Sequence, residues 1–122
     1  MAAAPTFEDL TAAARRLDGV ATVTPLLNDP GLDAELGGRV YLKAECLQRT
    51  GSFKFRGAFN KIVQLTDTQR AAGIVAHSSG NHAQAVAAAA MLAGTSATIV
   101  MPADGAAAYK TARTRALGAT VV

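Results

Sequence analysis

The stretch that decides the fold of this chain is Thr50-Gly51-Ser52-Phe53-Lys54-Phe55-Arg56-Gly57-Ala58. Gly51 allows a tight bend, because glycine tolerates backbone angles that other residues avoid. Ser52 is suited to capping a helix, since its hydroxyl can accept a hydrogen bond from a first-turn amide. The stretch therefore predicts a loop that ends at Ser52 and a helix that follows it. Apolar residues recur at helical spacing along one stripe of this helix, namely Phe55, Ala58, Phe59, Ile62 and Val63.

Lys54 falls in the first turn of this predicted helix. It lies about 100° from Phe55 around the helix axis, and so beside the buried stripe. Amides at a helix start favour a nearby negative charge and disfavour an ammonium group. A lysine in this place can lose its proton readily and act as a nucleophile. The stretch alone leaves a solvated surface lysine as the alternative.

A second stretch, residues 74–84, reads as a strand, a polar loop and the start of a helix. It consists of Ile74-Val75-Ala76-His77-Ser78-Ser79-Gly80-Asn81-His82-Ala83-Gln84. A loop between a parallel strand and a helix collects free amides at the positive end of the helix dipole. Such a loop commonly binds a carboxylate or a phosphate. The alternative is that Ser78, Ser79 and Asn81 only cap the helix.

Strands and helices alternate after residue 73. Strands are predicted at 74–76, 97–101 and 119–122, with helices at 80–93 and about 107–117. This order is typical of an α/β protein with a parallel βαβ sheet.

Shorter elements are predicted before residue 73. A helix begins after Thr6, which has Asp9 as a capping-box partner, and a short helix begins after Thr66. Extended segments at 23–27 and 39–45 are expected, the second half-buried because polar and apolar residues alternate. Turns are expected at 28–31 and 37–38.

The two stretches and their spacing resemble the fold-type II pyridoxal-phosphate enzymes. Leu47-Gln48 and residues 50–58 resemble the cofactor-lysine motif of that family, and residues 78–82 resemble its substrate-carboxylate loop. The most similar branch contains the threonine/serine dehydratases and serine racemase. The resemblance implies a tryptophan-synthase-β-like fold. It also implies a pyridoxal 5'-phosphate cofactor and a small amino-acid substrate, threonine or serine.

The resemblance also implies roles for individual residues. Lys54 would form a Schiff base with the cofactor and later remove the α-proton of the substrate. Phe53 would pack against the cofactor ring, and Asn81 would bond the 3′-oxygen of that ring. Ser79 would act as an acid or base on the opposite face, or would only bind the carboxylate. The substrate carboxylate would be held by Ser78, Ser79, Gly80, Asn81 and His82.

The activity implied is that of a threonine/serine dehydratase, which releases a 2-keto acid and ammonia. Three alternatives stay open: a serine racemase of the same family, a non-catalytic fragment, and an anion-binding α/β module.

Family members are typically more than twice as long as this chain, so the sequence is expected to be truncated. On the family pattern, residues 1–70 belong to the large cofactor-binding domain. Residues 71–122 belong to an incomplete small α/β domain that carries the carboxylate loop. The 122-residue chain alone is expected to be inactive. A homo-oligomer is expected for the complete protein.

Composition places few limits on function. Half of the residues are hydrophobic, 17% are charged and the net charge is +3, an ordinary globular mixture. Basic residues form no run interleaved with aromatics, so no nucleic-acid partner is predicted. The apolar run 83–93 is too short to cross a bilayer, so no membrane association is expected. Cys46 is the one cysteine, which predicts no internal disulfide and a cytoplasmic location. No metal site is predicted.

Overall fold

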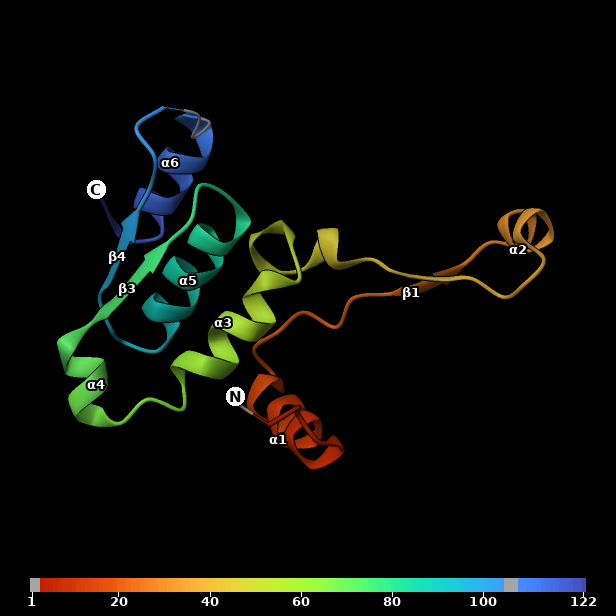
Figure 1. Ribbon diagram of the computed structural model, residues 1–122, viewed down its shortest axis with the longest axis horizontal. Helices are drawn as coiled ribbons and strands as arrows, with labels where there is room; N and C mark the ends of the chain where they lie inside the picture. Colours follow the sequence, from red (N-terminus) through yellow and green to blue (C-terminus); the bar gives the residue numbers. More distant parts are fainter. Residues whose placement is uncertain (1–2, 105–107) are drawn as a thin grey trace.

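An α/β unit, two helices beside it and a projecting arm make up the chain (Figure 1). The computed structural model describes residues 3–104 and 108–122. The elements, in chain order, are α1 (Phe7–Leu17), β1 (Leu26–Asn28), α2 (Pro30–Leu36), β2 (Tyr41–Lys43), the 3-10 turns η1 (Glu45–Leu47) and η2 (Arg49–Gly51), α3 (Lys54–Ile62), α4 (Asp67–Ala72), β3 (Ile74–His77), α5 (Asn81–Leu92), β4 (Ala97–Val100), α6 (Ala108–Ala116) and β5 (Thr120–Val121).

The α/β unit is built on a parallel sheet with strand order β3-β4-β5. In its register Ile74 lies opposite Ala97, and Thr98 opposite Thr120. The connections run through α5 and α6, which contact each other. The predicted α/β class with a parallel sheet is therefore confirmed. Position 107, where the last helix was expected to begin, lies outside the described residues.

Helix α5 is buried almost all round. It lies between the sheet and α3 (Figure 1), and it contacts both. Every residue from Ala83 to Ala90 is buried. A helix that is covered on all sides shows no single apolar stripe, and its alanine side chains let its neighbours approach closely. This packing holds the start of α5 firmly in place.

Helix α3 covers α5 with the predicted stripe. Phe55 is fully buried, and its ring stacks on Phe59 with the centroids 5.7 Å apart. Ala58 and Ile62 are also buried, whereas Val63 is only partly buried. The predicted face of this helix is confirmed.

The helices that precede and follow α3 begin as predicted. Thr6 and Asp9 form the capping box of α1, and Thr66 forms the same motif with Gln69 at the start of α4. Arg16 on α1 donates a hydrogen bond of 3.1 Å to Asn60 on α3.

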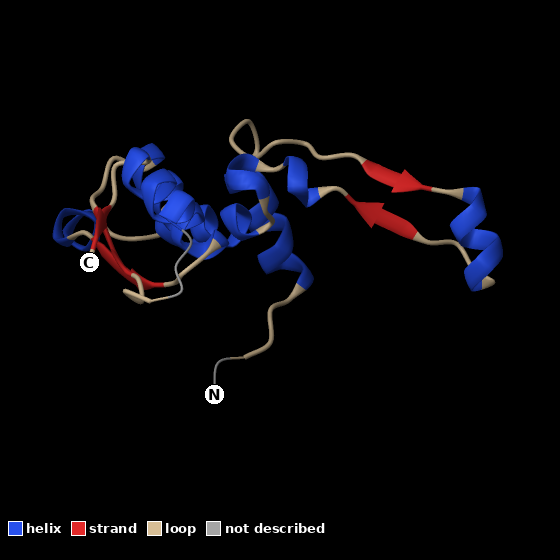
Figure 2. Cartoon of the chain, turned by 90° about the horizontal axis from the view of Figure 1, so that it is seen from above, coloured by secondary structure: helices blue, strands red, loops and turns tan. Residues whose placement is uncertain are grey.

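The arm consists of β1 and β2, which pair antiparallel and lead out to α2 and back (Figure 2). The turn predicted at 28–31 is wrong, because a helix begins there. Asp29 Oδ1 accepts a hydrogen bond of 2.8 Å from the Leu32 amide, and Pro30 occupies the first helical position, where a missing N–H costs nothing. The predicted turn at 37–38 is confirmed, since Gly37 ends α2 with φ of 66°.

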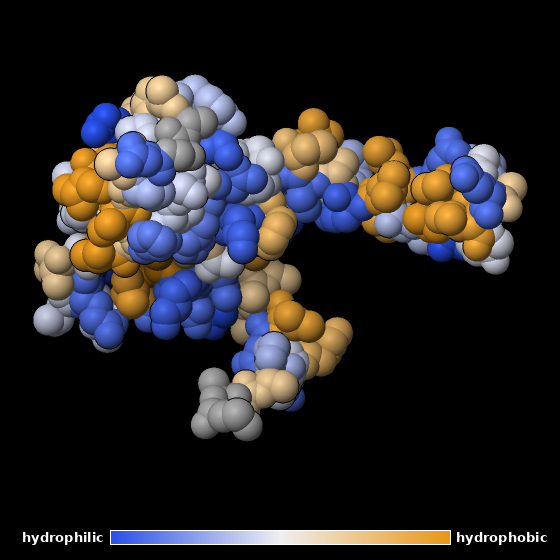
Figure 3. Space-filling view, turned by 45° about the horizontal axis from the view of Figure 1, so that its top comes forward, coloured by the Kyte–Doolittle hydropathy of each residue, from blue (hydrophilic) through white to orange (hydrophobic). Residues whose placement is uncertain are grey.

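The half-buried strand predicted at 39–45 is also wrong. The strand β2 is shorter, and all of its residues are exposed. The alternation of polar and apolar residues is typical of a strand whose apolar side is covered. No described residue covers the apolar side chains of β2. Figure 3 shows the resulting apolar patches along the arm.

No helix in the described part of the chain is both long and apolar enough to span a membrane.

Candidate active site

The loop before α3 makes its bend with two successive residues in the left-handed region. Gly51 has φ of 75°, as predicted, and Thr50 has φ of 62°. A β-branched residue rarely adopts this conformation, which costs about 1–3 kcal/mol. The Gly51 amide closes the bend with a hydrogen bond of 2.8 Å to the Gln48 carbonyl. The surrounding structure therefore holds this loop in one shape.

Ser52 does not cap α3, so that prediction is wrong. Phe53 occupies the cap position with helical dihedral angles, and no side chain caps this helix start. Ser52 lies one residue before the cap position in extended conformation, with φ of −159°. Its side chain is buried, and its Oγ has no hydrogen-bond partner among the described residues.

Lys54 is the first residue of α3 and is exposed. Its Nζ lies 4.9 Å from the centroid of the Phe53 ring, which is itself 60% exposed. The Lys54 Nζ makes no hydrogen bond or ion pair with another described residue. The amine and the aromatic ring are therefore both free to meet a ligand.

The first residue of the loop 78–82 is hydrogen-bonded to the sheet, whereas the end of the loop, at the start of α5, has no side-chain cap. The Ser78 amide donates a hydrogen bond of 3.1 Å to the Val100 carbonyl, at the end of the neighbouring strand. Ser78 Oγ accepts a bond of 3.2 Å from the Gly80 amide. Gly80 is the cap residue of α5, and no side chain accepts a capping hydrogen bond from the first turn of this helix. The interpretation that the polar residues only cap this helix is therefore wrong.

Several polar groups of the loop are unengaged by the rest of the described chain. The amides of Ser79, Asn81 and His82 donate no hydrogen bond to a described residue, and neither does the Ser79 hydroxyl. These groups surround the start of a helix, where the dipole favours negative charge. The arrangement can hold a carboxylate or a phosphate.

Two further elements approach this loop. Lys110 Nζ on α6 lies 3.7 Å from the position that a Cβ atom at residue 80 would take. His82 lines a cavity of about 210 Å³ together with Gly57 and Lys61 of α3. The structure thus brings one end of the loop beside α3, although no bond joins the loop to Lys54.

Three buried polar atoms have no partner among the described residues: Thr50 Oγ1, Ser52 Oγ and Gln84 Oε1. Buried polar groups are normally satisfied, and leaving one unpaired costs about 1–3 kcal/mol. Two of these atoms stand just before Lys54, and Gln84 is in the first turns of α5. A free amine, an open anion-binding loop and unpaired hydroxyls fit a charged, polar cofactor such as pyridoxal phosphate.

Sequence reasoning missed the ion pair between Glu45 of η1 and Arg56 of α3, which is two residues after Lys54. The shortest N–O distance of the pair is 2.7 Å. The Arg56 hydrogen bonds, assisted by one from Thr24, lower the pKa of the Glu45 carboxyl to about 2 against the opposing effect of burial. Both members are therefore charged at neutral pH. The partners are eleven positions apart, and no periodic pattern connects them.

This chain is similar in sequence to a protein family and to individual enzymes. A family model described as "Pyridoxal-phosphate dependent enzyme" matches residues 17–122. An L-threo-3-hydroxyaspartate ammonia-lyase from Pseudomonas sp is 57% identical over 95% of this chain and 36% of its own length. An L-threonine ammonia-lyase from Thermotoga maritima is 50% identical over 96% of this chain and 29% of its own.

This chain is also similar to solved structures. A maize serine racemase superposes with a TM-score of 0.91 at 39% identity, over 98% of this chain and 36% of that one. The chain therefore spans about a third of the length of the relatives that it matches.

Proposed function

The chain belongs to the family of pyridoxal-phosphate dependent enzymes, and on that premise we propose that the full-length protein is an ammonia-lyase of β-hydroxy amino acids. By full-length protein we mean a chain of the relatives' length that contains these residues. The reaction converts threonine or serine into a 2-keto acid and ammonia. The single observation that carries the proposal is the combination of an unengaged Lys54 with the unengaged loop at the start of α5.

Lys54 has two tasks in this proposal. Its Nζ holds the cofactor covalently, and when it is free of the cofactor it accepts the α-proton of the substrate. Pyridoxal phosphate, when bound, supplies an electron sink for negative charge on the α-carbon. Phe53 covers one face of the ring, which its exposure and its closeness to Lys54 Nζ support.

The loop 78–82 binds and orients the substrate. The free amides and the hydroxyls of Ser78 and Ser79 hold its carboxylate, and the helix dipole strengthens that contact. Gly80 and His82 belong to the same binding loop. Asn81 would hold the 3′-oxygen of the cofactor ring with its side-chain amide.

A second substrate is favoured by a specific observation. The relative at 57% identity is described as acting on L-threo-3-hydroxyaspartate, which carries a second carboxylate. Lys110 Nζ, close to Gly80, offers a cation on that side of the loop. Hydroxyaspartate is therefore the second candidate, and serine racemisation is the third.

The test is an assay of the purified full-length protein supplied with pyridoxal phosphate. We expect keto acid and ammonia in equal amounts from at least one of L-threonine, L-serine and L-threo-3-hydroxyaspartate. Chiral chromatography of the serine reaction measures racemisation in the same samples. Release of neither keto acid nor D-serine from any substrate would contradict the proposal.

Replacement of the loop hydroxyl tests the role of Ser79. We expect Ser79→Ala to lower turnover by about a hundredfold, because a substrate whose carboxylate is held less firmly is misplaced for reaction, and to leave cofactor affinity nearly unchanged. Steady-state kinetics and cofactor titration measure the two effects separately. Ser96→Ala is the matched control, because Ser96 is exposed in the connection before β4. A Ser79 variant that loses cofactor but turns over normally when resupplied would assign Ser79 to the cofactor instead.

A cytoplasmic location and a homo-oligomeric state stay predictions, as does the division into two domains at residue 70.

A further inference from the structure

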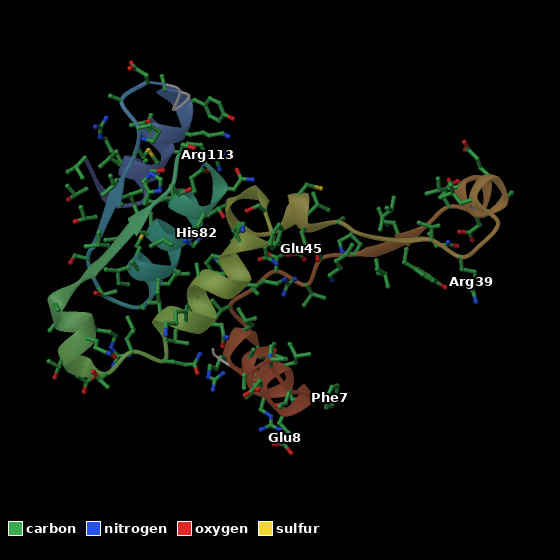
Figure 4. The ribbon with its side chains drawn as sticks, in the orientation of Figure 1. Phe7, Glu8, Arg39, Glu45, His82 and Arg113 are labelled. Carbon is green, nitrogen blue, oxygen red and sulfur yellow. The ribbon has the colours of Figure 1, made fainter. Side chains whose placement is uncertain are left out.

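Glu45 lies where the arm joins α3 (Figure 4), and it forms an ion pair with Arg56 of that helix. Arg56 Nε donates to Glu45 Oε2 over 2.8 Å, and Arg56 Nη2 donates to Glu45 Oε1 over 2.7 Å. A planar guanidinium that bonds a carboxylate twice fixes direction as well as distance. Only 15% of the Glu45 side chain is exposed, so solvent screens this pair less than a surface pair.

Further hydrogen bonds join the pair to the segment before the arm. Thr24 Oγ1 donates to Glu45 Oε1 over 2.5 Å, and Arg56 Nη2 also donates to the Thr22 carbonyl over 3.2 Å. The Gln48 side chain bonds the amide and the carbonyl of Thr22, each over 2.9 Å. Gln48 and Thr24 are 4% and 3% exposed. The ion pair thus belongs to a partly buried network that connects α3 with residues 22–24 and 45–48.

The network acts on the part of α3 that carries Lys54. Successive helical residues are about 100° apart, so Lys54 and Arg56 lie on opposite sides of Phe55. Phe55 is fully buried and fixes which face of α3 points inward. The bonds of Arg56 then oppose rotation of the first turn about the helix axis. The Lys54 Nζ makes no hydrogen bond to a described residue, and no side chain caps this helix start. Its direction therefore depends on its anchored neighbours.

We propose that Glu45 and Arg56 are positioning residues that orient the first turn of α3 so that Lys54 can bond the cofactor. They act through the helix. The inference rests on the proposed function, because Lys54 is its target.

The test measures cofactor attachment in the full-length protein, with no substrate present. Pyridoxal phosphate is titrated by its visible absorbance, and the fraction fixed to Lys54 by borohydride is measured by peptide mass spectrometry. We expect Glu45→Gln to raise the Kd for the cofactor by about tenfold or more, since misplaced reacting groups lose at least that much. Asp67→Asn is the matched control, because it breaks the exposed ion pair with Arg70 within α4.

A second variant separates positioning from a general loss of stability. Glu45→Gln alone leaves Arg56 without its counter-charge, which lowers the melting temperature. The double variant Glu45→Gln/Arg56→Gln removes both charges, so its melting temperature recovers while its cofactor affinity stays low. If Glu45→Gln gives no cooperative melt, the variant Arg56→Lys is used in its place. Lysine keeps the positive charge but cannot form the bidentate hydrogen bonds with Glu45.

Cofactor affinity equal to that of the unaltered protein in a folded single variant would overturn the inference. So would recovery of affinity together with melting temperature in the double variant. Failure of the unaltered protein to attach the cofactor at Lys54 is a different result, and it would overturn the proposed function together with this inference.

Discussion

Replacement of Lys54 by alanine in the full-length protein is expected to abolish covalent cofactor attachment and keto-acid release together. Lys54 is exposed at the start of α3 and has Phe53 beside it. In the proposed reaction it both holds the cofactor and moves a proton, so its loss removes two contributions at once. We expect ammonia release to fall by at least about a thousandfold, within the range of single catalytic groups.

The measurement uses absorbance of the bound cofactor, borohydride fixation and ammonia release on the same preparations. Lys61→Ala is the matched control, because Lys61 lies in the last turn of the same helix. The control should keep the visible absorbance and the covalent attachment. An adduct that borohydride still fixes in the Lys54 variant would show that another amine carries the cofactor.

The sequence predicts best the features that depend on residues only a few positions apart. The buried stripe on α3, the capping box of Thr6 with Asp9 and the helix start after Thr66 were predicted from residues a few positions apart, and they are observed. The parallel sheet follows from the alternation of strands and helices. The helix features depend on residues that are close together in sequence, and the sheet class depends on the order of the elements, so both can be predicted from the sequence.

The detail of the loop before α3 depends on contacts that are distant in sequence. Gln48 bonds Thr22, which is 26 positions away, and this anchors the bend that places Thr50 in the left-handed region. The bend moves Ser52 out of the cap position that its residue type favours. The start of α2 was missed for another reason. Asp29 and Pro30 suit a turn as well as a helix start, and only the hydrogen bond to Leu32 decides between them.

Residues 1–122 expressed alone are expected to release no keto acid and to self-associate. Large apolar side chains are exposed on four elements. Phe7 on α1 is 82% exposed, Leu26 and Leu42 on the arm are 60% and 53% exposed, and Val75 on the open face of the sheet is 75% exposed. Covering a side chain of this kind stabilises by about 1.5–3 kcal/mol. Exposed apolar surface on this scale favours association.

The physical reason is that these patches lie on elements which other protein surface normally covers. An isolated two-stranded pair is only marginally stable in water, and the arm is such a pair with both of its strands exposed. Whole domains are stable by only about 5–15 kcal/mol, so several uncovered side chains are a large part of the total. We therefore expect a broad thermal transition and a sedimentation coefficient that rises with protein concentration.

The control for this prediction is a variant with a polar arm. Leu27 and Leu42 lie opposite each other across β1 and β2, so Leu27→Lys/Leu42→Glu replaces an apolar cross-strand pair by an opposite-charge pair that preserves pairing. This variant should associate less than the unaltered segment, because the exposed apolar area of the arm is smaller. Both segments should lack lyase activity with threonine, serine and hydroxyaspartate. A monomer with a sharp melt and measurable turnover would show that residues 1–122 need no covering surface, and that the exposed side chains are tolerated as they stand.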